Sequence, residues 1–311
     1  MTAKRIAALI FGFFLSVIIF ECSIRIATPL LGPPIVSWNT MEDAKRLKLR
    51  DFKVEYGQPE FVFMGNSTTL IGVNTEVFDK YSNSQQSRSF NAGMNGANIV
   101  NIRDFAVDFV IPEIRPKNLV ILFSNLGMLL NSEYQAFSPN KVSWLNKSRL
   151  YLYRNTLRDP MTLNTLIRVI KYRDTNQGII YRWAAQLNDF GYQDITRTSI
   201  TETGWSPESN RKVEQTINVN QNDIKFITEI RDFARAKNIN LIIGTVPKLS
   251  FDQKLRATVK SVAKELDIGF IQGNDALGAG EFFQDGTHLN YQGSIEFSKF
   301  LGRKLGKDFN N

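Results

Sequence analysis

The sequence has very few of the side chains that build metal sites and disulfides. Its 311 residues include one histidine, His288, and one cysteine, Cys22. A zinc site needs several histidine or cysteine ligands, so the composition excludes a His- or Cys-based metal site, and we expect no cofactor. A single cysteine cannot form a disulfide within the chain, so the fold must be held by its core.

The scarcity of histidine also narrows the chemistry. Any general base that works near neutral pH has essentially one candidate, His288, because histidine takes up and returns a proton in that range. The segment Asp285-Gly286-Thr287-His288-Leu289 places a carboxylate three residues upstream, where it can fix the tautomer of the ring. The alternative is that a lone His beside a turn Asp is an ordinary loop residue.

Long hydrophobic runs are also missing. The uncharged apolar run at 6–20 has fifteen residues, whereas a membrane span usually needs about twenty, and extending it to residue 29 includes two charged residues. Lys4 and Arg5 precede it, so the positive-inside rule places the N-terminus in the cytoplasm and the bulk of the chain outside. We predict an uncleaved signal anchor over 1–30, giving a single-pass membrane protein with an extracytoplasmic domain. A cleaved signal peptide, which needs only a short apolar core, is the alternative.

Acidic residues are fewer than basic ones, 30 against 38, which gives a net charge of +8. This excess favours an anionic partner surface, such as phospholipid head groups, teichoic-type polymers or acidic polysaccharide. A solvated basic face is the alternative. Nucleic acid is not expected as a partner, because the chain is predicted to lie outside the membrane and has no recognisable binding motif.

The chain does contain short apolar runs that alternate with helical patterns. Strands are predicted over 60–64, 118–123 and 240–247, and helices over 97–109, 221–237, 255–266 and 294–305. Strands alternating with helices predict an α/β fold, with a parallel sheet covered on both faces and a site at the carboxyl ends of the strands.

A serine turn follows the first of these strands. Gly65 allows the chain to turn sharply, and Asn66 tolerates unusual backbone angles. Ser67 would then begin a helix, where outward-pointing N–H groups can hold a developing oxyanion. An ordinary helix N-cap is the alternative, since Asn, Ser and Thr are all favoured there.

Two further segments supply candidate hydrogen-bond donors. Gly93 lies in Ser89-Phe90-Asn91-Ala92-Gly93-Met94-Asn95-Gly96, where its N–H can approach a bound carbonyl. Asn125 follows the strand at 118–123 and can donate its side-chain amide to the same site. The alternatives are a Gly-rich strand-to-helix turn and a loop Asn that satisfies local backbone.

In this chain order, Ser67, Gly93, Asn125 and the Asp285–His288 pair resemble the four blocks of the SGNH (GDSL-like) hydrolase superfamily. The resemblance implies an SGNH-like three-layer α/β/α fold. It also implies that Ser67 is the nucleophile, His288 the general base and then acid, and Asp285 its orienting partner. Ser67, Gly93 and Asn125 would supply the oxyanion hole.

The resemblance covers roughly 61–130 and 238–305, and departs from the family pattern in two places. The usual Gly-Asp-Ser is Gly65-Asn66-Ser67 here, and the usual Gly-x-Asn-Asp is Phe123-Ser124-Asn125-Leu126. Together with the anchor, these departures resemble the divergent, membrane-tethered branch that acts on cell-envelope polymers.

The remaining segments are predicted from composition. Residues 31–57 look like a juxtamembrane linker with one helix over 41–52, followed by the SGNH-like domain over 58–311. A segment rich in Tyr, Trp and Arg, about 138–220, is predicted to be an insertion that caps the site. Its aromatic rings could stack on sugars and its arginines could hold anionic groups. Alternatively, the aromatic residues simply pack the insertion onto the core.

The expected function is therefore an envelope-side serine acyl enzyme that works through an acyl-Ser67 intermediate. If a sugar hydroxyl of a glycan or other envelope polymer resolves it, the protein is an O-acyltransferase, and if water does, it is an esterase. The tethered relatives, such as alginate O-acetylation proteins, receive the acyl group through a multi-pass acyltransferase partner, and the resemblance is compatible with one here. A non-catalytic SGNH-fold scaffold or glycan-binding subunit of an envelope acylation complex is the alternative, motivated by Phe123 and Leu126.

Overall fold

The computed structural model describes residues 3–27, 40–82, 88–129, 184, 186–193, 224–249, 253–277 and 280–308. The N-terminal helix α1 (Ala3–Ala27) belongs to one compact unit, and the sheet with its helices belongs to another. Of the predicted insertion over 138–220, residue 184 and residues 186–193 are described, and the rest lies outside the described residues.

The sheet has five parallel strands in the order β2-β1-β3-β4-β5. They are β1 (Phe61–Gly65), β2 (Phe90–Asn91), β3 (Asn118–Phe123), β4 (Asn240–Thr245) and β5 (Gly269–Gln272). β1 and β3 are buried along their whole length, as expected for continuous apolar strands in a parallel sheet. The predicted α/β fold with a parallel sheet is confirmed. β5 was not predicted, because this edge strand buries only Ile271 and carries a weak apolar signal.

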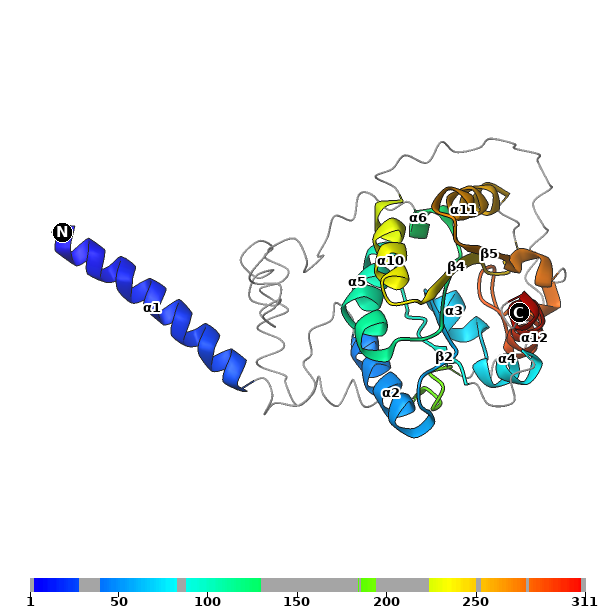
Figure 1. Ribbon diagram of the computed structural model, residues 1–311, viewed down its shortest axis with the longest axis horizontal. Coiled ribbons are helices and arrows are strands. Elements are labelled where there is room, and N and C mark those ends of the chain that lie inside the picture. Colours follow the sequence, from blue (N-terminus) through cyan, green and yellow to red (C-terminus); the bar gives the residue numbers. More distant parts are fainter. Residues whose placement is uncertain are drawn as a thin grey trace. The chain divides into compact units, whose positions relative to one another are not determined.

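Helices lie on both sides of the sheet (Figure 1). One face is covered by α3 (Ser67–Gly72), α4 (Thr75–Tyr81) and α12 (Tyr291–Asp308). The other is covered by α5 (Ile99–Phe105), the π-helical η2 (Ala106–Ile114) and α10 (Lys225–Arg235), while α11 (Gln253–Leu266) packs against β4 and β5. Short 3₁₀ segments, η5 (Gly273–Ala276) and η6 (Gly280–Phe282), connect β5 to the loop before α12.

The core on the first face is built from alternate residues of the strands. Phe61 and Phe63 of β1 point to the same side, and both rings meet Phe78 of α4 edge-on, with centroids 5.1 and 4.8 Å apart. Phe297 of α12 joins the same cluster. Burial of each such ring contributes about 1.5–3 kcal/mol, so this cluster fixes α4 and α12 against the sheet.

The direction of the strand order reverses at β1. The chain leaves β1 toward β2 on one side, while β3 lies on the other side of β1. In parallel sheets such a reversal of strand order opens a binding crevice at the carboxyl ends. Ser67 follows β1 and Asn125 follows β3, so both stand at the carboxyl ends of these neighbouring strands.

The predicted linker contains a helix that packs on the sheet domain. α2 (Thr40–Tyr56) extends past the predicted 41–52. Its Leu49 and Phe52 are buried, and the Phe52 ring lies 5.6 Å from that of Phe90 and 6.0 Å from that of Phe190. The three-residue spacing explains why both side chains lie on the same helix face.

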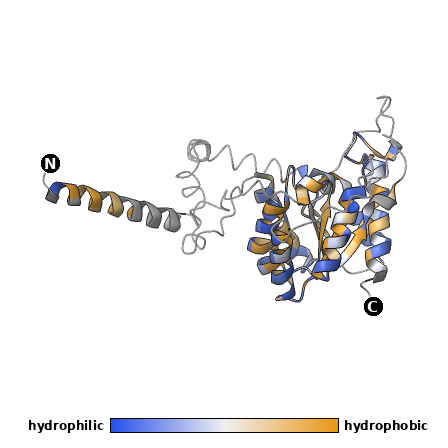
Figure 2. Cartoon of the chain, turned by 90° about the horizontal axis from the view of Figure 1, so that it is seen from above, coloured by the Kyte–Doolittle hydropathy of each residue, from blue (hydrophilic) through white to orange (hydrophobic). Residues whose placement is uncertain are grey.

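The N-terminal segment is helical and largely apolar after its first turn (Figure 2). Its large apolar side chains are exposed, among them Leu9, Phe11 and Phe13. In the described part of the chain, no helix is both long and apolar enough to cross a membrane. The signal anchor over 1–30 stays a prediction.

Candidate active site

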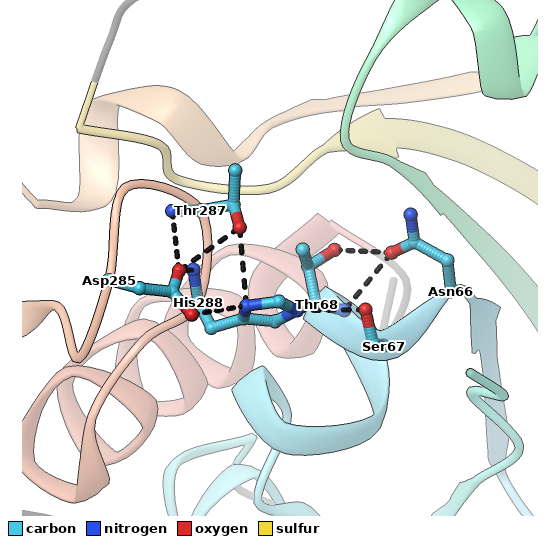
Figure 3. A network of polar contacts seen from close by, with 6 residues as sticks. All are labelled: Asn66, Ser67, Thr68, Asp285, Thr287 and His288. Atoms are coloured by element: carbon cyan, nitrogen blue, oxygen red, sulfur yellow. Dashed lines mark hydrogen bonds and ion pairs between the residues drawn. The ribbon is translucent and has the colours of Figure 1, made fainter. Parts of the chain in front are cut away.

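The structure brings together Ser67, His288 and Asp285 in a continuous hydrogen-bonded relay (Figure 3). The Ser67 Oγ lies 2.8 Å from the His288 Nε2, although the two residues are 221 positions apart in the chain. The His288 Nδ1 lies 2.8 Å from the Asp285 Oδ2. A hydroxyl beside an imidazole that is itself held by a carboxylate is the arrangement that activates a serine nucleophile.

Ser67 is positioned as the first residue of α3. The Asn66 Oδ1 accepts hydrogen bonds from the Thr68 N–H at 3.0 Å and the Thr68 hydroxyl at 2.7 Å. The N-cap alternative is therefore correct for Asn66, and it leaves the Ser67 side chain to face His288. Position 65, the last of β1, requires a glycine for close approach, because a Cβ there would lie 2.8 Å from the Leu122 carbonyl oxygen.

Backbone hydrogen bonds connect the two ends of the Asp285–His288 loop. The Gln284 N–H donates to the His288 carbonyl at 2.9 Å, and the Asn290 N–H donates to the Phe282 carbonyl at 2.9 Å. The Asn290 Oδ1 then accepts the Gly293 N–H at 2.9 Å as α12 begins. These bonds connect the loop to η6 and α12, on either side of the segment that places His288 beside Ser67.

The Asp285 carboxylate is held by donors from its own loop. Its Oδ1 accepts the Thr287 N–H at 2.8 Å, the His288 N–H at 2.7 Å and the Thr287 hydroxyl at 3.1 Å. Partial burial alone would raise the pKa of Asp285, but the two backbone N–H groups and the His288 ring outweigh it and lower this pKa. Asp285 therefore stays ionised to a lower pH than an ordinary Asp.

Thr287 was not singled out from the sequence. Besides binding Asp285, its hydroxyl lies 3.2 Å from the His288 Nδ1. Its place between the two predicted residues was visible, but an exposed loop threonine carries no signal of its own without the fold.

The predicted oxyanion donors differ in their availability. The Ser67 N–H is the first of α3 and has no acceptor among the described residues, as expected at a helix N-terminus. The Gly93 N–H already donates to the Asn91 Oδ1 at 2.9 Å. Gly93 does lie close to α3, because a Cβ at this position would be 2.5 Å from the Leu70 N. Its N–H, however, is already used in the bond to Asn91.

Asn125 is also partly engaged. Its Oδ1 caps α6 (Leu126–Leu129) by accepting the Met128 N–H at 2.8 Å, which is the local role that the alternative interpretation expected. Its Nδ2 donates to the Ser124 Oγ at 3.2 Å, and the same oxygen accepts from the Asn66 Nδ2 at 2.7 Å. Ser124 thus ties Asn125 to the residue before Ser67. An amide nitrogen carries two hydrogens, so Asn125 keeps one further donor.

Asn91 was missed as a site residue. It is fully buried, and its Nδ2 reaches three carbonyl oxygens at the end of α3, those of Thr69, Leu70 and Val73, at 2.9, 3.1 and 2.7 Å. Its side chain therefore links the helix that starts with Ser67 to the loop that carries Gly93. Its position two residues before Gly93 was the only sequence signal.

The described part of the insertion contains two aromatic residues, Phe190, which packs against Phe52 of α2, and Tyr192. The Tyr192 side chain is buried, and its hydroxyl lies 3.0 Å from the Ser294 Oγ of α12. For this residue the packing alternative is the correct one. Apart from Phe190 and Tyr192, the aromatic residues of the predicted insertion lie outside the described residues. Within the described ranges, no group of three or more His, Cys, Asp or Glu residues could hold a metal ion.

No protein-family model matches the chain, and no curated protein matches it. Among solved structures, a Bacteroides fragilis protein described as an acylhydrolase is 15% identical with a TM-score of 0.41, covering 88% of this chain and 99% of that one. A GDSL-like lipase from Bacteroides thetaiotaomicron is 14% identical with a TM-score of 0.39, covering 85% and 98%. These values do not establish a shared activity.

Proposed function

We propose that the chain is an SGNH-like serine acyl enzyme that forms an acyl-Ser67 intermediate. The observation that carries the proposal is the relay itself, with two 2.8 Å contacts joining Ser67, His288 and Asp285 from distant segments. A packing role explains it poorly, because the Asp285 side chain is 51% exposed and the His288 side chain 26% exposed. Exposed polar pairs contribute little to stability, whereas a reactive group must be reachable.

In the first half of the proposed reaction, the His288 Nε2 accepts the Ser67 hydroxyl proton as the Oγ attacks the acyl carbonyl. The Asp285 carboxylate stabilises the resulting imidazolium without taking its proton. His288 then gives the proton to the leaving oxygen, the carbon–oxygen bond to the leaving group breaks, and the acyl group stays on Ser67.

In the second half, an acceptor hydroxyl loses its proton to His288 and attacks the acyl carbonyl. Collapse of the tetrahedral intermediate returns the proton to the Ser67 Oγ and releases the new ester. With a sugar hydroxyl as acceptor the reaction is O-acyl transfer, and with water it is ester hydrolysis.

Among the three donors, the Ser67 N–H is the most available for the oxyanion, because no described residue accepts a hydrogen bond from it. A substrate oxygen would have to share the Gly93 N–H with the Asn91 Oδ1. Asn125 would contribute through its second amide hydrogen. Loss of a single oxyanion donor typically costs on the order of a hundredfold or more in rate, so this sharing matters.

We favour a polymer acyltransferase over a free lipase. The support is indirect: the apolar N-terminal helix that would tether the domain, the excess of basic charge for an anionic surface, and the sequence departures at Phe123 and Leu126. The acceptor would be a glycan or another envelope polymer, and a multi-pass acyltransferase partner could deliver the acyl group across the membrane.

The test is to quench the protein rapidly after mixing it with an activated acetyl ester and to measure its intact mass. One acetyl group on Ser67, absent in Ser67→Ala and retained in Ser261→Ala, is the expected result. Ser261 is an exposed serine of α11 and controls for nonspecific acylation. Transfer is supported if added envelope polysaccharide speeds the loss of the acetyl group from Ser67 and the polysaccharide becomes acetylated. Rapid hydrolysis with no acetylated polysaccharide would favour an esterase.

A second candidate is a non-catalytic scaffold or glycan-binding subunit with a degenerate site. The observation that favours it is that the Gly93 N–H and one amide hydrogen of Asn125 are already bonded within the protein. On this view Ser67→Ala leaves the cellular envelope modification intact, while loss of the whole chain abolishes it.

A further inference from the structure

A buried lysine contacts Asn91, the residue whose side chain binds the Gly93 N–H. Lys45 of α2 is fully buried, whereas lysine is almost never fully buried unless it is paired. Its Nζ donates to the Asn91 carbonyl at 2.6 Å and to the Gly191 carbonyl, and no carboxylate of the described residues forms an ion pair with it. Burial lowers the pKa of Lys45 well below its ordinary value.

Removing an ammonium group from water is strongly unfavourable, so a lysine with no counterion among the described residues destabilises a core position. An apolar side chain of similar length would pack there at lower cost. What it could not do is hold the two carbonyl oxygens, which belong to different segments of the chain. The specific contribution of Lys45 is therefore its hydrogen bonds to these two oxygens, of which the bond to Asn91 is the one that reaches the site.

Asn91 carries this contact into the site. Its N–H donates to the Phe190 carbonyl at 2.8 Å, and its carbonyl oxygen accepts from Lys45. With both backbone groups fixed, its side chain is aimed between the Gly93 N–H and the carbonyl oxygens at the end of α3. A displacement of Asn91 would therefore move a proposed oxyanion donor and the helix that begins with Ser67.

We propose that Lys45 is a positioning residue that fixes Asn91 and thereby sets the placement of Gly93 relative to Ser67. This rests on the proposed function. The consequence is that the geometry of the site depends on the docking of α2, the first described helix after α1. The same amine also binds the turn at Gly191, so Lys45 connects three segments: α2, the strand that contains Asn91, and this turn.

The experiment uses the full chain and compares Lys45→Met with Lys48→Met. Lys48 lies on the same helix and contacts the same turn, pairing with Asp189 at 3.1 Å, but it does not touch Asn91. With p-nitrophenyl acetate, Lys45→Met should lower kcat by ~10- to 100-fold with KM within about twofold, because small displacements of catalytic groups cost this much. Lys48→Met should match the wild type. Lys45→Gln, which keeps amide donors, should recover part of the loss and serves if the Met variant does not fold.

Amide hydrogen exchange on the same proteins gives a readout that does not need activity. Lys45→Met should speed exchange in residues 67–73 and 91–93 and leave β4 unchanged, whereas Lys48→Met should change none of them. Equal kcat and equal exchange in Lys45→Met and Lys48→Met would overturn the proposal. A wild type that p-nitrophenyl acetate does not acylate at Ser67 would instead overturn the proposed function, and the exchange pattern would still decide whether Lys45 positions the two segments.

Discussion

At the scale of single residues, the relay depends on the carboxylate of Asp285. Asp285→Asn keeps the size of the side chain but replaces the negative oxygen that faces the His288 Nδ1 with a neutral amide. We expect the rate of acylation at Ser67 to fall by ~10²- to 10⁴-fold with the fold retained, because the ring loses its orienting charge. The rate is measured by intact mass with an acyl ester. Asp51→Asn, an exposed change on α2, should have no effect, and an equal rate in both variants would contradict the assigned role.

The glycine at position 93 is a second residue with a steric requirement. A Cβ on Gly93 would lie 2.5 Å from the Leu70 N and 2.8 Å from the Leu70 Cα, both backbone atoms of α3. Gly93→Ala should therefore displace α3. We expect the free energy of unfolding to fall by ~1–3 kcal/mol and the rate of acylation at Ser67 to fall at least ~10-fold. Urea denaturation and the acylation rate measure the two effects.

Gly286→Ala is the matched control for this change. Gly286 lies in the Asp285–His288 loop, and a Cβ there meets no atom within 4 Å. It should leave stability and acylation close to those of the wild type. If Gly93→Ala behaves in the same way, close contact between the Gly93 loop and α3 is not required.

At the scale of elements, α4 contains a carboxyl group that makes stability depend on pH. Asp79 is largely buried; its Oδ2 accepts the Ser89 N–H at 2.9 Å, and its Oδ1 has no hydrogen-bond partner among the described residues. Burial raises the pKa of Asp79 from 3.8 to about 7, despite the opposing hydrogen bond from the Ser89 N–H. Because the folded-state pKa is raised, the stabilising effect is complete below about pH 4 and is lost as the pH rises to about 7.

Asp79→Asn should remove this dependence. The difference between a pKa of 3.8 and one of about 7 corresponds to at most ~4 kcal/mol. Between pH 4 and pH 8, the free energy of unfolding of the wild type should therefore fall by up to ~4 kcal/mol relative to that of the variant. The free energy of unfolding in urea at the two pH values measures it, with Asp51→Asn as control. A difference between wild type and Asp79→Asn that does not change with pH would contradict the account.

The elements also show how much of the fold could be predicted from the sequence. The strands at 60–64, 118–123 and 240–247 were visible because their residues are apolar and face helices on both sides. β2 and β5 lie at the edges of the sheet and are short, so their patterns are weak. The unbroken helix expected over 97–109 instead becomes π-helical from residue 106, where packing overrides the regular period.

The same limit applies to the site. Ser67, Asp285 and His288 could be predicted because each stands in a short motif of chemically specialised residues. Asn91 and Lys45 could not, because their roles depend on contacts between segments 46 residues apart. That the Gly93 N–H is already engaged is likewise a property of three-dimensional packing.

At the scale of the whole molecule, the proposal of a tethered enzyme makes a separable prediction. Removing residues 1–30 should release the chain from membranes, because it removes the apolar side chains exposed on α1. Acylation of Ser67 should be unchanged, since the relay is formed by residues of the sheet unit. Alkaline extraction of membranes measures the release, and intact mass after mixing with an acyl ester measures the acylation. A full-length gene product whose mass shows that the N-terminal segment has been lost would favour a cleaved signal peptide.

The central claim is that Ser67 is chemically activated, and a fluorophosphonate probe tests it most directly. Intact-mass spectrometry of the domain from about residue 31 onward should show one adduct, with none in Ser67→Ala and a retained adduct in Ser261→Ala. The adduct should form much more slowly in Asp285→Asn. A well-folded domain that gains no adduct, or one whose adduct persists in Ser67→Ala, would contradict the claim.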